Sequence, residues 1–112
     1  MRIVAFLKLK KGINKDDFKK WVRKKDLPAG RKLLCAKSYY MAEIKEADGI
    51  DTKHEFMEIW EVTDKEEWLK MGDFDWMKEI EEVYEKYVDS TQTQIFYGID
   101  VWMNYKFMYS IF

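Results

Sequence analysis

The chain has 112 residues, with 20 Lys and Arg against 21 Asp and Glu, and this length predicts a single domain over residues 1–112. The opposite charges are dispersed, which argues against nucleic-acid binding, and no apolar run approaches the roughly 20 residues that span a membrane. The single cysteine, Cys35, cannot form an internal disulfide, and the charged N-terminus is not typical of a signal peptide. We therefore expect a soluble, cytoplasmic protein.

The first third of the chain has the pattern of a strand followed by a helix. Residues 2–9 alternate between a wholly apolar face and a mixed face, which is typical of a strand. A helix is expected to begin after Asn14, a favourable N-cap residue, and to end near Lys25. Pro28 disfavours helical geometry at the preceding Leu27, so we expect the chain to leave the helix there.

The remaining elements follow the same kinds of signal. Alternation predicts strands at about residues 36–44, at 54–62 ("HEFMEIWEV") and at 93–101 ("TQIFYGIDV"). A second helix should begin at Asp64, its expected cap, and break or kink near Gly72. The element order is therefore β-α-β-β-α-β.

This order predicts an α+β, ferredoxin-like antiparallel sheet with both helices on one face. The other face is then left without helices, and we expect it to carry a set of large apolar side chains, which comprises Val4, Phe6, Phe56, Trp60 and Val62. A second copy of the sheet is the simplest cover for such a surface. The expected assembly is a homodimer in the form of a dimeric α+β barrel.

Asp26 is an anion at the end of the cationic stretch "VRKKD", where the negative end of a helix favours cations instead. Two interpretations are open. Asp26 is either the cap of a new short helical turn over residues 28–32, or a group that serves a ligand or a partner arginine.

Glu58 lies between Phe56 and Trp60 on one face of its predicted strand. If that face is buried, the pKa of Glu58 rises towards neutrality and the carboxyl becomes a candidate general acid or base. The alternative is a simple ion pair with Lys8 or Arg2 on a neighbouring strand. Asp26 and Glu58 are the candidate catalytic residues.

Aromatic residues make up 17% of the chain, more than two small helices would cover, so we expect a flat pocket for a planar aromatic ligand. The candidate binding residues are Trp21, Tyr39, Tyr40, His54, Trp60 and Phe6. His54 is the only histidine, so no metal site is predicted, and its two open roles are a solvated imidazole and a haem ligand. Cys35 is interpreted as a small buried hydrophobic residue.

The stretches "FLKLKKGINKDDFKKWVRKKDLPAGRKL", "KSYYMAEI" and "EFMEIWEVTDKEEW" resemble the RedY-like proteins, which are related to EthD-like proteins within the dimeric α+β barrel group. The most specific part is Trp21 followed by Asp26, Leu27 and Pro28. The resemblance implies a pocket between the helix-free sheet face and the loop after the first helix, and a place in pathways for tripyrrole pigments. Leu27 stands where many relatives in the wider group have a histidine.

Two functions follow as hypotheses. The first is a small enzyme that needs no cofactor and acts on an aromatic or conjugated, pyrrole- or polyketide-like substrate by proton transfer, oxidation, cyclisation or condensation, with Asp26 and Glu58 moving protons. The second is a binding or interaction module that holds such a ligand unchanged. They differ in whether both carboxyl groups point into one cavity.

The C-terminal segment, residues 102–112, alternates between wholly apolar and mixed positions and is rich in aromatic residues. This pattern predicts that residues 103–111 extend the preceding strand or form a fifth strand at a sheet edge, in this chain or in a partner subunit. The alternative is a tail that folds over the pocket as a lid.

Overall fold

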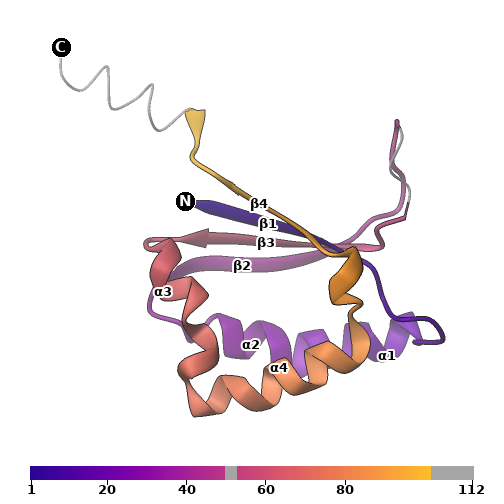
Figure 1. Cartoon of the computed structure of the whole chain (residues 1–112), viewed down its shortest axis with the longest axis horizontal. Coiled ribbons are helices and arrows are strands. Elements are labelled where there is room, and N and C mark those ends of the chain that lie inside the picture. The colour runs from indigo at the N-terminus through magenta and orange to yellow at the C-terminus, as the bar shows by residue number, and fades with distance from the viewer. Residues whose placement is uncertain (50–52, 102–112) are drawn as a thin grey trace.

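The computed structural model describes residues 1–49 and 53–101. It contains a four-stranded antiparallel sheet in the order β2-β3-β1-β4. The helices lie on one side of this sheet (Figure 1), so the expected α+β architecture is confirmed. The elements are β1 (Arg2–Leu7), α1 (Lys15–Trp21), η1 (Val22–Asp26), α2 (Leu27–Gly30), β2 (Ala36–Glu43), β3 (Phe56–Val62), α3 (Lys65–Leu69), η2 (Met71–Asp73), α4 (Asp75–Tyr87), η3 (Ser90–Gln92) and β4 (Gln94–Gly98).

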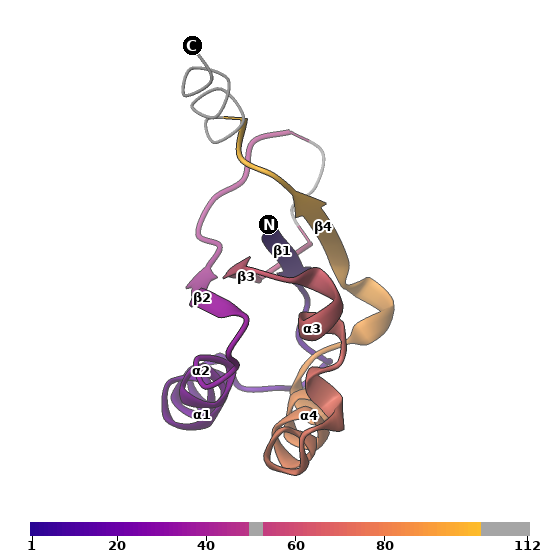
Figure 2. The same ribbon diagram turned by 90° about the vertical axis from the view of Figure 1, so that its left-hand side faces the viewer.

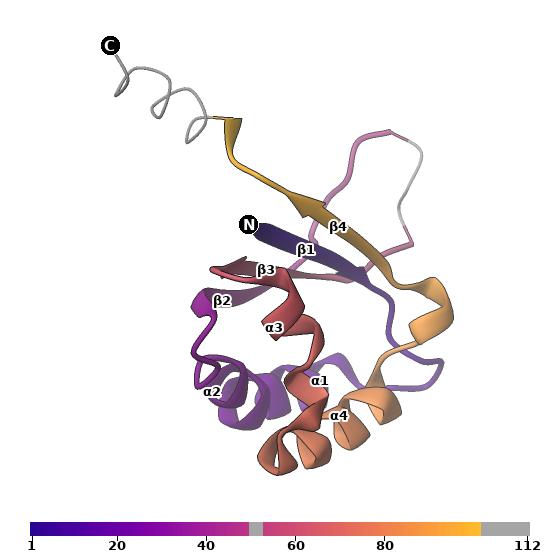
Figure 3. The ribbon, with the colours of Figure 1, turned by 60° about the vertical axis from the view of Figure 1, so that its left-hand side comes forward.

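The helical layer has two columns beneath the sheet, as the end-on view shows (Figure 2). One column is formed by α1, η1 and α2, and the other by α4. Strand β4 lies beside β1 at the edge of the sheet opposite β2 (Figure 3). The sheet and the two columns enclose the space in which the candidate site lies.

Local capping explains where the helices begin. The Asn14 side chain accepts hydrogen bonds from the backbone N–H groups of Asp16 and Asp17. Asp64 accepts in the same way from Glu66 and Glu67 at the start of α3. Both caps agree with the sequence-based expectation, as does the interruption around Gly72, which lies in the 3-10 turn η2.

The expected helix end near Lys25 is wrong. The chain continues through the π-helical turn η1 directly into α2, and the Leu27 N–H bonds to the carbonyl of Val22, five residues earlier. Pro28 lies in the first turn of α2, where a missing N–H costs little. The wider π turn therefore allows the chain to pass a proline without leaving the helical path.

The two faces of the sheet follow from the strand register, in which Ile3 and Tyr39 both pair with Trp60. The helix-covered face of β3 carries Phe56, Glu58, Trp60 and Val62, all of which are buried. The expectation that Phe56, Trp60 and Val62 lie on the helix-free face is therefore wrong. Alternation separates the two faces of a strand but does not say which one the helices cover.

The helix-free face carries the opposite set of side chains. Val4 pairs with Ile59 and with Phe96, and Phe6 pairs with Met57, so an apolar centre runs across β3, β1 and β4. The expectation for Val4 and Phe6 holds, and both are only half-buried.

No helix within the described residues is both long enough and apolar enough to cross a membrane. The predicted additional strand at residues 102–112 lies outside the described residues.

Candidate functional site

A cavity of about 450 Å³ lies between the helical layer and the helix-covered face of the sheet. Its size is within the range of small-molecule sites, and aromatic and aliphatic side chains form most of its wall. Asp26 of η1 and Glu58 of β3 both line it. This cavity lies on the side of the sheet opposite to the helix-free face, where the resemblance implies a pocket.

Asp26 is buried, with 6% of its surface exposed, and accepts a hydrogen bond from the hydroxyl of Tyr39. The expected short helical turn is present as α2, with Asp26 at its N-cap position and Pro28 in its first turn, but the Asp26 side chain makes no capping hydrogen bond. Burial, followed by the nearby Glu58 carboxyl, raises the pKa of Asp26 to about 7, although the hydrogen bond from Tyr39 acts in the opposite direction. Near neutral pH the carboxyl of Asp26 is therefore able both to take up and to release a proton.

Glu58 is also buried and is held by two donors from different elements. The indole Nε1 of Trp60 donates to Oε1 at 3.0 Å, and the hydroxyl of Tyr84 donates to Oε2. Burial raises the pKa of Glu58, while these two hydrogen bonds lower it. The alternative ion pairs are absent from the described contacts, because Lys8 pairs with Glu55, and Arg2 with Glu61 and Asp100.

Tyr39 and Trp60 form a stacked pair that supports both carboxyl groups. Their ring centroids lie 3.7 Å apart, with an interplanar angle of 7°. Gly30 of α2 makes this arrangement possible, because an added Cβ would lie 2.5 Å from Cδ2 of Tyr39 and 2.7 Å from Cη2 of Trp60. The stack thus requires a residue without a side chain where α2 crosses it.

The two tyrosine hydroxyls remain neutral donors at ordinary pH. Burial raises the pKa of Tyr39 and of Tyr84, and the neighbouring carboxyl groups raise both pKa values further. Each hydroxyl therefore orients one carboxyl group without competing for its proton.

The other expected binding residues lie away from this cavity. Trp21 packs against the rings of Phe18, Tyr84 and Tyr87 in the core. Tyr40 is 57% exposed on the helix-free face.

Phe6 also lies on the helix-free face, in contact with the ring of His54. The His54 Nε2 is 2.8 Å from the carbonyl oxygen of Gln92. Of the expected binding residues, only Tyr39 and Trp60 line the cavity with the two carboxyl groups.

Sequence reasoning missed the contribution of the second helical segment to the wall. Trp68, Met77, Ile80 and Tyr84 line the cavity. Three of them belong to the apolar stripe of α4, which the sequence pattern does show. In the sequence, this stripe is indistinguishable from ordinary core residues. Nothing near residue 84 indicates that its hydroxyl donates a hydrogen bond to Glu58 of β3.

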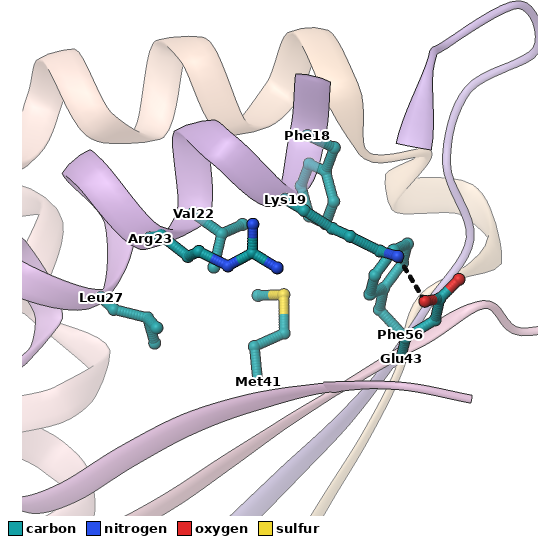
Figure 4. A pocket seen from close by; sticks show the side chains of 8 residues that line it. All are labelled: Phe18, Lys19, Val22, Arg23, Leu27, Met41, Glu43 and Phe56. Carbon is teal, nitrogen blue, oxygen red and sulfur yellow. Dashed lines mark ion pairs between the residues drawn. The ribbon is translucent and has the colours of Figure 1, made fainter. Parts of the chain in front are cut away.

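A second hollow, of about 250 Å³, lies between η1 and the sheet (Figure 4). Its carboxylate, Glu43, is paired with Lys19 and Lys45, and these bonds lower its pKa to about 2. Glu43 therefore stays ionised and paired with the two lysines. The larger cavity is the better candidate for proton chemistry.

The described residues contain no group of three or more His, Cys, Asp or Glu side chains arranged to hold a metal ion. Cys35 is buried, as expected of a small hydrophobic residue, and burial raises the pKa of its thiol.

Three solved structures show the same fold. HapK from Hahella chejuensis is 12% identical, with a TM-score of 0.69, over 88% of this chain and 93% of that chain. An EthD family protein from Bacillus halodurans is 15% identical, with a TM-score of 0.63, over 88% and 97%. A dimeric ferredoxin-like protein from Thermobifida fusca is 10% identical, with a TM-score of 0.63, over 88% and 89%.

Curated proteins include no significant match to this sequence. The family model described as REDY-like protein HapK matches residues 1–99, which is most of the chain. This match agrees with the resemblance seen in the strand and helix motifs. The chain belongs to the REDY-like HapK family.

Proposed function

We propose that this protein is a small enzyme that moves protons on an aromatic or conjugated substrate, using its own carboxyl groups and no cofactor. The observation that carries the proposal is that the buried side chains of Asp26 and Glu58 line one cavity, with the pKa of Asp26 at about 7. A general acid or base acts best when its pKa is near the working pH. Membership of the REDY-like family adds support for a pyrrole-like substrate.

In the proposed step, the Asp26 carboxylate takes a proton from an acidic C–H, N–H or O–H group of the substrate. The protonated carboxyl then returns a proton at a second position of the conjugated system, so that the net change is a rearrangement or a ring closure without loss of electrons. Glu58 acts in the same way on the part of the substrate that lies nearer to it, taking up one proton and returning one. Tyr39 and Tyr84 fix the directions in which the two carboxyl groups point.

The proposed assembly is a homodimer through the helix-free face. Its apolar side chains are half-buried or exposed in the single chain, where Tyr40 is 57% and Phe96 54% accessible to water. A patch of this kind is unusual on a protein that works alone. The fold is shared with a protein described as dimeric.

The test measures proton transfer directly, without knowledge of the natural substrate. The purified protein is incubated in D2O with a panel of phenols, pyrroles and indoles, and mass spectrometry follows deuterium incorporation above the uncatalysed background. Asp26→Asn and Glu58→Gln should each lower the enzyme-dependent rate about 100-fold or more. Glu79→Gln, at an exposed position of α4 outside the cavity, is the matched control and should keep the wild-type rate.

A non-catalytic binding module is the second candidate function. It is favoured by one observation, which is that both carboxyl groups already have hydrogen-bond donors inside the protein. Saturable ligand binding without deuterium incorporation by the wild-type protein would establish this second function and contradict the first.

A further inference from the structure

The charged residues of the cavity wall limit the kinds of ligand that the cavity can bind. This inference rests on the proposed function of the same site. Four acidic residues line the cavity, and no Lys, Arg or His does so among the residues that the structure describes. Asp26 and Glu58 are buried, whereas Glu81 is half-buried and Glu85 is exposed on α4. The acidic groups thus extend from the interior of the cavity to its solvent side.

Two cations that lie close in sequence to cavity residues are directed to other groups. Lys65 lies over the ring of Tyr97, 4.2 Å from its centroid. Arg31 donates from Nε to the carbonyl of Tyr39 at 3.1 Å. An anionic ligand entering the cavity would therefore meet carboxyl groups with no cation in the wall to balance its charge.

A second observation points to a ligand in the same place. Trp68 lines the cavity, is only 6% exposed, and its indole Nε1–H has no hydrogen-bond partner among the described residues. A buried donor without a partner is costly and is uncommon in native proteins. A ligand that reached this edge of the indole with an acceptor atom would satisfy it.

We propose that the cavity binds a planar nitrogen heteroaromatic that is neutral or cationic, that donates N–H to the buried carboxyl groups, and that accepts a hydrogen bond from Trp68 through a carbonyl or similar oxygen. The stacked rings of Tyr39 and Trp60 and the side chains of Met77 and Ile80 supply the apolar wall for such a ring system. The acidic residues of the wall exclude acidic aromatic compounds from the cavity by repulsion between like charges.

The first experiment compares matched probes by titration calorimetry with the full-length wild-type protein. Acridone and xanthone both carry a ring carbonyl but differ in one position, N–H against O. Acridone should bind about tenfold more tightly, because a hydrogen bond to a charged group is lost in xanthone. The cation 9-aminoacridine should bind at least about tenfold more tightly than anthracene-9-carboxylate. Equal affinities within either pair, or no binding of any probe, would overturn the inference.

Variants locate the effect. Replacing the two carboxylates of α4 that line the cavity, Glu81→Gln with Glu85→Gln, should weaken binding of the cationic probe about two- to fivefold. The control Glu79→Gln with Glu82→Gln changes two exposed carboxylates of the same helix that do not line the cavity. An equal loss in both double variants would show that the helix attracts cations only through its overall charge, which contradicts the proposed site.

Trp68→Phe removes the indole N–H while keeping an aromatic ring. Acridone and xanthone should both lose affinity, by about fivefold, because a neutral hydrogen bond to their carbonyl is removed. The cation 9-aminoacridine has no carbonyl and should bind as before. Unchanged acridone affinity in a variant with the wild-type circular dichroism would refute the role of Trp68.

These results separate this inference from the proposed function. Preferential binding of the anionic probe would refute the ligand class and leave catalysis untouched, because catalysis is measured by deuterium incorporation.

Discussion

The two faces of β3 place very different chemistry within one short strand. The helix-covered face carries Glu58 and Trp60, which are buried beside the cavity, whereas the helix-free face carries Ile59 between Met57 and Glu61. One face holds a titratable group in a pocket, and the other presents an apolar surface. Neighbouring residues on this strand should therefore have separable effects, on the site and on assembly.

The largest expected effect comes from Trp60→Ala. Loss of this buried, stacked indole should lower the free energy of unfolding by about 3 to 5 kcal/mol, and it also removes a donor from Glu58. Urea denaturation followed by circular dichroism measures the change. Ile59→Ala, one residue away on the opposite face, should cost about 1 kcal/mol. Equal losses in the two variants would show that the faces are not distinct.

A charge on the helix-free face should act on assembly instead. Ile59→Lys places an unpaired cation at the centre of the proposed dimer interface, which should weaken association by about 3 kcal/mol or more, equivalent to about 100-fold. Sedimentation equilibrium across a range of protein concentrations measures this. A wild-type protein that is monomeric at micromolar concentration would contradict the proposed interface itself.

Gly30→Ala should disturb the helix-covered face alone. The added methyl group meets the Tyr39 and Trp60 rings at 2.5 and 2.7 Å, so overpacking should cost about 1 to 3 kcal/mol of unfolding free energy. Gly98→Ala is the matched control, because no atom lies within 4 Å of its added Cβ. If Gly30→Ala is as stable as the control, the stack does not depend on close approach by α2.

The last expected effect concerns pH and is small at any single step of the series. The pKa of Asp26 is about 7 in the folded chain against 3.8 as its ordinary value, so the folded state binds the proton more tightly. Its contribution to stability is complete below about pH 4 and is lost as the pH rises through about 7. As the pH rises over this range, the unfolding free energy of Asp26→Asn should therefore fall less steeply than that of the wild type, by about 1 kcal/mol per pH unit.

The matched control for this pH series is Asp73→Asn, at an exposed position of η2. Wild type and control should show the same slope when unfolding is measured across the series. An Asp26→Asn protein with that same slope would mean that Asp26 is ionised in the folded state.

Local signals in the sequence were sufficient for the order of elements and the helix starts. Asn14 and Asp64 cap their helices through neighbouring N–H groups, so nothing distant is needed to recognise them. The faces of β3 were assigned wrongly, because both faces carry large apolar residues and the choice depends on where the helices pack. Only the assembled sheet settles that choice.

Part of the candidate site could also be predicted from local signals in the sequence. Asp26 was visible as a misplaced anion and Glu58 as a carboxyl group between aromatic residues, and the structure brings both to one cavity with Tyr39 and Trp60. Tyr84 was not found, since it meets Glu58 from a separate helix 26 residues along the chain. Contacts of this kind have no local signature.

The π turn η1 determines the direction in which the later side chains of the first helical column point. In a regular α-helix each residue advances by roughly 100°, so the extra residue in a π turn rotates all later side chains by about that angle relative to those before it. Phe18 belongs to the phase before the turn and packs in the core, whereas Gly30 belongs to the phase after it and faces the Tyr39 and Trp60 rings. Removing a single residue from positions 22–25 would therefore leave the composition of the site unchanged while turning Gly30 away from those rings.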